Sequence, residues 1–125
     1  MSHHLVLVVS SHPARQATSA ATVRAAGYWP LAADTARRAL ALLDELRPAV
    51  ILTDAALIDG RAVALLHALR HIPDLARVPV VVRGPLTLDE HHCLANDVAA
   101  HGYPSDADAL RFLLTAILRD DPRPA

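Results

Sequence analysis

The chain has no lysine among its 125 residues, and all 12 of its basic side chains are arginines. Its formal net charge is −1 and the arginines form no stripe, so neither direct nucleic-acid binding nor attraction to an anionic membrane is indicated. A single cysteine, Cys93, excludes an internal disulfide and is typical of a reducing compartment. Charged residues interrupt the apolar runs well before the length of a membrane span. We therefore expect a cytoplasmic protein that contacts neither nucleic acid nor membrane directly.

Apolar residues make up 53% of the chain, enough to form one sizeable core in a single domain. Short β-branched runs alternate with segments of helical pattern. We expect strands at residues 5–9, 28–32, 49–53, 78–82 and 98–101, and helices at residues 13–26, 35–47, 61–71, 87–96 and 105–119. The alternation predicts an α/β fold, a five-stranded parallel sheet flanked by five helices. We expect this domain to cover residues 1–119, with residues 120–125 as a tail or the start of a linker.

Local signals mark the ends of several elements. Ser10 and Ser11 stand just before a proline and are the expected caps of the first helix. Pro30 places the second strand at an edge of the sheet, because proline cannot donate to a strand ladder. Thr87 and Glu90 match a capping box at the start of the fourth helix.

Asp54 is the main candidate for a functional group. It directly follows the apolar run of residues 49–53, which suits a buried central strand. In open parallel sheets, ligands and chemistry gather at the carboxyl ends of such strands. A simpler interpretation is that Asp54 caps nearby backbone amides at the end of its strand.

A series of short landmarks runs along most of the chain, from residue 5 to residue 118. They are Val8-Val9 before Pro13, Gly27-Tyr28, Arg47-Pro48 before Asp54, Asp59-Gly60, Leu69-Arg70, Val78-Pro79-Val80, and Pro104 six residues before Leu110. In this order and spacing they resemble the receiver domains of two-component response regulators. The resemblance implies the flavodoxin-like (βα)5 receiver fold, places Asp54 at the phosphoacceptor position, and implies a histidine kinase or another signalling protein as partner.

The resemblance also exposes departures around Asp54. The family supplies an acidic pair after the first strand to hold Mg²⁺, and Ser10 and Ser11 stand there instead. Neutral hydroxyls beside one carboxylate are poor ligands for Mg²⁺, which prefers several hard oxygens. The loop after Asp54 is also about two residues shorter than in the family. We therefore expect no cofactor, weak or absent Mg²⁺ binding, and no enzyme.

Three further family positions have changed. Gly84 stands where the family has a Thr or Ser hydroxyl, with Arg83 before it as a possible source of positive charge. Tyr103 replaces the family lysine, and Ala100 replaces the aromatic switch residue. Tyr103 is either a packed aromatic or a hydroxyl that reaches Asp54. These changes predict a degenerate receiver, or pseudo-receiver.

Three functional hypotheses remain open. The leading one is signal transduction through phosphorylation-independent protein–protein interaction, including a possible homodimer. By resemblance it uses the face formed by the fourth helix, fifth strand and fifth helix, with Leu88, Arg111 and Phe112 as candidate contacts. The alternative is a genuine phosphoacceptor at Asp54 with an altered, Mg-poor pocket. A more remote alternative is a small-ligand sensor that uses a neutral pocket of Ser10, Ser11 and Tyr103.

Two clusters contain several of the chain's histidines. His67 and His71 lie four residues apart, a spacing able to bind a metal, but no third ligand is near in sequence, so exposed surface histidines are the simpler prediction. His91, His92 and Cys93 are adjacent and point in different directions on a helix, so a catalytic arrangement is not expected. Cys93 is predicted to be a small core residue.

Overall fold

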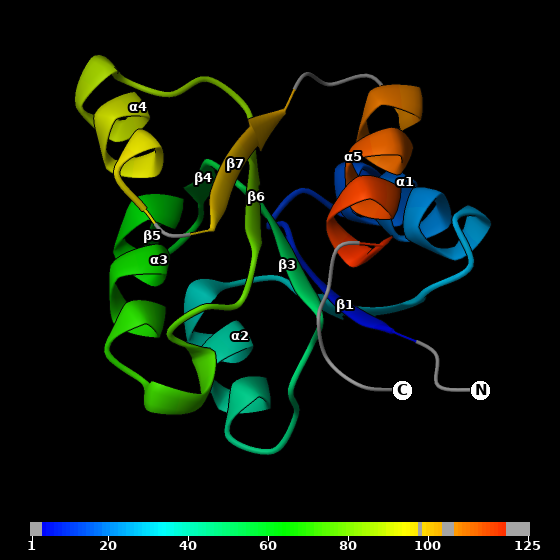
Figure 1. Cartoon of the computed structure of the whole chain (residues 1–125), viewed down its shortest axis with the longest axis horizontal. Helices are drawn as coiled ribbons and strands as arrows, with labels where there is room; N and C mark the ends of the chain where they lie inside the picture. Colours follow the sequence, from blue (N-terminus) through cyan, green and yellow to red (C-terminus); the bar gives the residue numbers. More distant parts are fainter. Residues whose placement is uncertain (1–3, 98, 104–106, 120–125) are drawn as a thin grey trace.

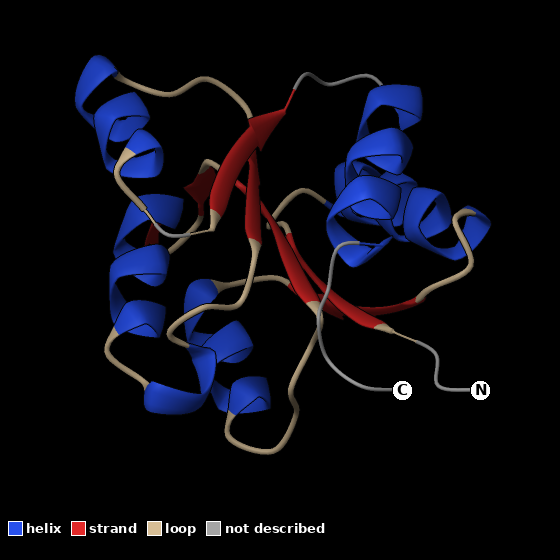
Figure 2. Cartoon of the chain, in the orientation of Figure 1, coloured by secondary structure: helices blue, strands red, loops and turns tan. Residues whose placement is uncertain are grey.

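The computed structural model of the chain describes residues 4–97, 99–103 and 107–119. Its centre is a parallel sheet of five strands in the order β2-β1-β3-β6-β7. Helices cover both faces of this sheet (Figures 1 and 2), with α1 and α5 on one face and α2, α3 and α4 on the other. The predicted α/β fold with five parallel strands and five α-helices is confirmed.

The elements have the following bounds. The strands of the central sheet are β1 (Leu5–Val9), β2 (Trp29–Ala33), β3 (Val50–Asp54), β6 (Val80–Arg83) and β7 (Ala100–Tyr103). The helices are α1 (Pro13–Ala25), α2 (Ala36–Leu43), α3 (Ala62–Arg70), α4 (Leu88–Ala95) and α5 (Ala107–Arg119), with a 3-10 turn, η1, at Pro73–Leu75. A small antiparallel hairpin, β4 (Ala56–Leu57) with β5 (Gly60–Arg61), follows β3 and was not predicted.

Strand β3 is buried along its whole length, as a central parallel strand should be. Its alternate residues face opposite sides of the sheet. Ile51 packs in the core beneath α2 and α3, whereas Val50 and Leu52 pack with Val23 of α1 and Leu114 of α5. Each such apolar side chain contributes roughly 1.5–3 kcal/mol by leaving water. By the same alternation, Asp54 points to the face covered by α1 and α5.

Several element ends differ from the predictions for local reasons. Helix α2 ends at Leu43 rather than at Arg47, and the Arg47 guanidinium donates to the carbonyl oxygens of Leu43 and Leu46 beyond that end. The predicted serine cap of α1 is wrong. The N-cap is His12, whose Nδ1 accepts the Arg15 backbone N–H at 3.3 Å, since both serine hydroxyls are bound elsewhere.

Other local predictions are confirmed. Strand β2 lies at the edge of the sheet, as Pro30 indicates, and Thr87 with Glu90 forms the complete capping box of α4. The expected tail, residues 120–125, lies outside the described residues. Among the helices that the structure does describe, none has the length and apolarity to cross a bilayer.

Candidate functional site

Side chains from separate elements meet at the carboxyl edge of the sheet. Ser10 directly follows β1, Asp54 ends β3 and Arg83 ends β6, where the register makes Asp54 and Arg83 direct neighbours. Arg15 reaches the same place from the first turn of α1. Parallel strands bring their carboxyl ends together, so this is the edge at which the fold predicts a site.

The carboxylate of Asp54 is 3% exposed and is surrounded by donors. Ser10 Oγ donates a hydrogen bond of 2.6 Å to Oδ2, and Arg15 Nη1 lies 3.4 Å from the same oxygen. Arg83 Nε lies 3.5 Å from Oδ1. These contacts come from side chains and not from backbone amides, so the amide-capping interpretation of Asp54 is not supported within the described residues.

The side chains around Asp54 are positively charged, whereas those around a metal-binding carboxylate are usually negatively charged. Two guanidinium groups face one carboxylate, which gives the three side chains a formal sum of +1. The Ser10 hydroxyl uses its proton on Asp54, and the described residues hold no group of three or more His, Cys, Asp or Glu side chains placed to bind a metal. Mg²⁺ needs several hard oxygen ligands. The donor set at Asp54 does not fit the Mg²⁺ ion that the resemblance implies.

Ser11 and Asp59 organise the loops beside the site. Ser11 Oγ accepts the backbone N–H of Ile58 at 2.9 Å and donates to the carbonyl oxygen of Asp34. Asp59 accepts the backbone N–H groups of Ala36 and Arg37 at 2.9 and 3.0 Å, so it caps the start of α2 from the β4–β5 hairpin. These two amides, Ala36 first, lower the pKa of Asp59 below its ordinary value. Both side chains thus bind backbone groups of neighbouring loops.

The remaining predicted positions lie on or next to β6 and β7. Gly84 follows β6 with φ +117°, a conformation that L side chains rarely adopt, so the position where the resemblance to receiver domains predicts a hydroxyl has a backbone that favours glycine. Tyr103 is paired in register with Arg83, which places it at the correct edge, but its side chain lies outside the described residues. Ala100 is paired with Val80 at the other end of β7 and packs against the core.

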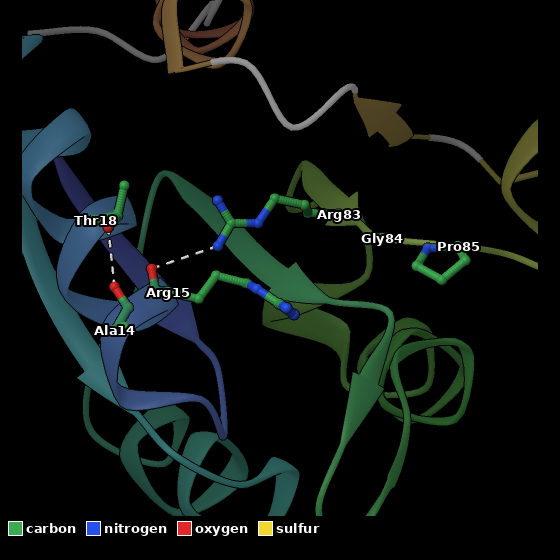
Figure 3. A pocket seen from close by; sticks show the side chains of 6 residues that line it. All are labelled: Ala14, Arg15, Thr18, Arg83, Gly84 and Pro85. Carbon is green, nitrogen blue, oxygen red and sulfur yellow. Dashed lines mark hydrogen bonds between the residues drawn. The ribbon is translucent and has the colours of Figure 1, made fainter.

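A hollow of about 370 Å³ opens beside Asp54, between α1 and the loop after β6. It is lined by Ala14, Arg15, Thr18, Arg83, Gly84 and Pro85. Figure 3 shows the two arginine side chains extending across it from opposite sides, one from α1 and one from β6. Arg83 Nη2 donates to the Arg15 carbonyl oxygen at 3.4 Å and spans the gap.

Two charged pairs that the sequence did not reveal fix the neighbouring helices. Arg61, the N-cap of α3, binds both carboxylate oxygens of Glu90 at 2.7 and 2.8 Å. The Arg61 hydrogen bonds and then the Thr87 backbone N–H lower the pKa of Glu90 to about 2, and Glu90 raises the pKa of Arg61. Arg70 binds Asp97 with distances of 2.7 to 3.1 Å. Both pairs tie α4 to α3.

In the part of the chain that the structure describes, neither histidine cluster belongs to a group of three or more side chains placed to bind a metal. His67 and His71 are exposed, as predicted, and their rings lie 4.6 Å apart, but His71 Nδ1 is bound to the His67 carbonyl oxygen. His91 and His92 are also exposed. The prediction that Cys93 is a core residue is wrong: it is exposed, because α4 turns Glu90 and Leu94 inward and Cys93 lies off that face.

Comparisons with known proteins identify the fold. No family model matches the sequence, and no curated protein matches it. Solved structures do match. The chemotaxis response regulator CheY4 of Vibrio cholerae is 18% identical with a TM-score of 0.83, over 93% of this chain and 99% of that one.

Two receiver domains of histidine kinases match as well. The one from Syntrophus aciditrophicus is 20% identical with a TM-score of 0.84, over 98% of this chain and 95% of that one. The one from PA1611 of Pseudomonas aeruginosa, whose structure has a magnesium ion in its active-site cleft, is 21% identical with a TM-score of 0.81, over 95% of this chain and 100% of that one. At these identities the likeness shows the fold, and this chain has the fold of CheY-like receiver domains.

Proposed function

We propose that this chain is a receiver-like signalling module that acts by protein–protein interaction without a Mg²⁺-dependent phosphorylation cycle. The observation that carries the proposal is the pair of guanidinium groups facing Asp54, at 3.4 and 3.5 Å. In phosphoryl transfer, a divalent cation neutralises the transferred group while the acceptor oxygen attacks. Here side-chain cations occupy the two sides of the carboxylate, and Ser10 is hydrogen-bonded to it. The proposed role is signalling and not catalysis.

A specific observation keeps a second function in view. Asp54 ends the central strand of a receiver fold, and the PA1611 receiver domain in the comparison binds Mg²⁺ in its cleft. In this second function Asp54 is a phosphoacceptor in which arginines take over the role of the metal. The two functions differ in whether a covalent phosphoryl group ever forms on Asp54.

Intact-mass spectrometry after incubation with acetyl phosphate and Mg²⁺ separates the two. We expect no added phosphoryl group on the wild-type chain or on Asp54→Asn. A Mg²⁺-dependent adduct that Asp54→Asn loses would refute the leading proposal and establish the phosphoacceptor. An adduct that forms equally without Mg²⁺, and is lost in Asp54→Asn, would establish a metal-independent phosphoacceptor.

The proposed interaction surface is the face formed by α4, β7 and α5. In Figure 1, α4 and α5 lie on either side of β7. Leu88 and Phe112 are 71% and 77% exposed, and Arg111 is exposed beside Phe112. Large exposed apolar side chains rimmed by charge suit a docking surface for a signalling protein, a histidine kinase or a second copy of the chain. The cytoplasmic location and the homodimer remain predictions.

Light scattering coupled to gel filtration tests the homodimer arm. If this face joins two copies, the wild-type chain elutes with a dimer mass that falls to the monomer mass in Leu88→Ser/Phe112→Ser. Ile58→Ser provides a matched control, because Ile58 is 81% exposed but lies on the β4–β5 hairpin. If the wild-type chain is monomeric at high concentration, the homodimer is refuted, and the proposed partner of this face is a different protein.

A further inference from the structure

We propose that His67 and His71, on the exposed face of α3, form a surface site that reversibly binds one divalent metal ion of the class of Zn²⁺. Both side chains are exposed, and they stand four residues apart at the C-terminal end of the helix. Residues at this spacing are neighbours on one face of a helix. Helix α3 ends before η1 and the start of β6 (Figure 1), so the pair lies toward the opposite edge of the sheet from Asp54, which ends β3. Metal binding here is therefore independent of the chemistry of Asp54.

The separation of the two rings matches that of two ligands of one metal ion. The ring centroids are 4.6 Å apart, and the ring planes are tilted by 59°. A Zn–N bond of about 2.0–2.1 Å puts each ring centroid about 3.2 Å from the metal, so two rings that meet there at about 90–110° have centroids about 4.5–5.2 Å apart. The observed separation falls within this range, so the two rings can share one ion without moving apart.

The tautomer of His71 suits a metal ligand. Its Nδ1 lies 2.8 Å from the backbone carbonyl oxygen of His67. A carbonyl oxygen only accepts hydrogen bonds, so Nδ1 carries the proton and the neutral ring keeps its free electron pair on Nε2. Histidine ligands commonly donate their second ring N–H to a backbone carbonyl in this way, which fixes the orientation of the ring. One member of the pair thus already has the tautomer that metal binding through Nε2 requires.

The surroundings of the pair favour a cation. His67 lies in the last turn of α3 and His71 is its C-cap, where the partial negative charge of the helix end stabilises positive charge. Arg70 stands between them in the sequence, but its guanidinium is bound to Asp97 on the side of α4. The next exposed residue on the histidine face is Ala64, whose methyl group leaves room for the water ligands of a bound ion.

The ligand type selects the metal. Imidazole nitrogens suit Zn²⁺, Cu²⁺ and Ni²⁺, whereas Mg²⁺ and Ca²⁺ prefer oxygen ligands. Within the described residues no third His, Cys, Asp or Glu completes the pair, so water fills the other coordination positions. We therefore expect weaker, reversible binding than at a structural zinc site with four protein ligands.

Isothermal titration calorimetry with Zn²⁺ in a non-coordinating buffer tests the proposal. We expect a saturable binding event that His67→Gln and His71→Gln each weaken about tenfold or more, since even the loss of an outer-shell partner costs about 10–100-fold in metal affinity. The double variant His91→Gln/His92→Gln is the matched control. It also removes two exposed imidazoles from a helix, but they are adjacent and so do not share a face. Its Zn²⁺ affinity should equal that of the wild-type chain.

The two single variants also separate a ligand from a structural role. His67→Gln keeps the backbone carbonyl that His71 binds, so the end of α3 stays capped and only one imidazole is lost. We expect this variant to have the urea midpoint of the wild-type chain without metal, and weakened Zn²⁺ binding. His71→Gln loses both the ring and its bond to the carbonyl, so its midpoint should fall as well.

NMR spectra of the histidine ring nitrogens provide a readout for each residue. Without metal, His71 should show the tautomer protonated on Nδ1. Zn²⁺ should shift the ring nitrogens of His67 and His71 together, with no such effect from Mg²⁺, and should leave those of His91 and His92 in place. Asp54→Asn should bind Zn²⁺ like the wild-type chain.

Three results would each overturn the proposed site. They are the absence of saturable Zn²⁺ binding, an equal loss in His67→Gln and in His91→Gln/His92→Gln, and Zn²⁺ binding that leaves the His67 and His71 ring signals unchanged. A covalent adduct from acetyl phosphate would instead overturn the proposed function, whatever the zinc titration shows.

Discussion

Replacing Asp54 with Asn should destabilise this protein. Asp54 is 3% exposed, and its negative charge faces two arginine side chains. Asn has nearly the same shape, so the substitution removes the charge and little else. In a cluster of carboxylates, the same change would relieve repulsion and would stabilise the fold or leave it unaffected. The sign of the change therefore reports which charge pattern surrounds Asp54.

The size of the effect follows from three contacts. Loss of charge at a buried ion pair costs up to roughly 3–5 kcal/mol, but the 3.5 Å separation from Arg83 Nε lowers that figure. Arg15 is half exposed, so its contact adds about 0.5 kcal/mol or less. The Asn carbonyl still accepts from Ser10, which leaves a neutral hydrogen bond weaker by about 1 kcal/mol. Together we expect a loss of about 2–3 kcal/mol, or a fall in Tm of about 10 °C.

Urea unfolding followed by circular dichroism at pH 7 provides the measurement. Asp74→Asn is the matched control. Asp74 lies 3.2 Å from Arg47 with both side chains exposed, so its loss should change the free energy of unfolding by less than about 0.5 kcal/mol. An Asp54→Asn variant that keeps its fold and is as stable as the wild-type chain, or more stable, would refute the argument that Arg15 and Arg83 balance this carboxylate.

Three further predictions concern the surroundings of the site. Because Arg61 holds the pKa of Glu90 at about 2 against an ordinary value of 4.5, the pair stabilises the fold above pH 4.5, and that stability disappears as the pH falls toward 2. The urea midpoint should therefore fall more steeply between pH 4.5 and pH 2 in the wild-type chain than in Glu90→Gln. Parallel curves for the two proteins would contradict this prediction. The effect is smaller than the shift alone suggests, since Arg61 is 41% exposed. Gly84→Thr should cost about 1–3 kcal/mol in urea unfolding because φ is +117° there, and an unchanged midpoint would show that the loop can rearrange. Arg70→Met should cost up to about 3 kcal/mol in urea unfolding, since it leaves the Asp97 side chain, which is 9% exposed, without its guanidinium. Arg70→Met/Asp97→Leu should recover part of that loss if the charge itself is the cause.

Much of the fold could be predicted because its signals are local or periodic. The uninterrupted apolar run before Asp54 marks a central strand, and the Thr87 to Glu90 spacing marks a helix start within a single turn. Pro30 marks the sheet edge because proline has no backbone N–H to donate to a neighbouring strand. Each of these depends on residues no more than a few positions apart, so the sequence alone carries the information.

The partners of Asp54 could not be predicted in the same way. Arg15 lies 39 residues from Asp54 in the chain, and nothing in its helical pattern separates it from an exposed arginine such as Arg24. Its place in the first turn after a strand end was the one available signal. The sequence predicts that this strand ends at residue 82, whereas in the structure β6 extends to Arg83 and thereby pairs it with Asp54. The extension of β6 by this one residue places Arg83 directly beside Asp54.

The changes at the carboxyl edge form one consistent electrostatic arrangement. A carboxylate cluster requires an external cation, because buried like charges repel strongly. Here Ser10 contributes a neutral donor, and Arg15 and Arg83 contribute positive charge from within the chain, so the negative charge of Asp54 faces cations that the chain itself supplies. Replacing Ser10 with Asp would not by itself create a Mg²⁺ site, since the two guanidinium groups would bind the new carboxylate first. Ser10 after β1, where no acidic side chain stands, and Arg83 at the end of β6 are thus two parts of the same charge balance.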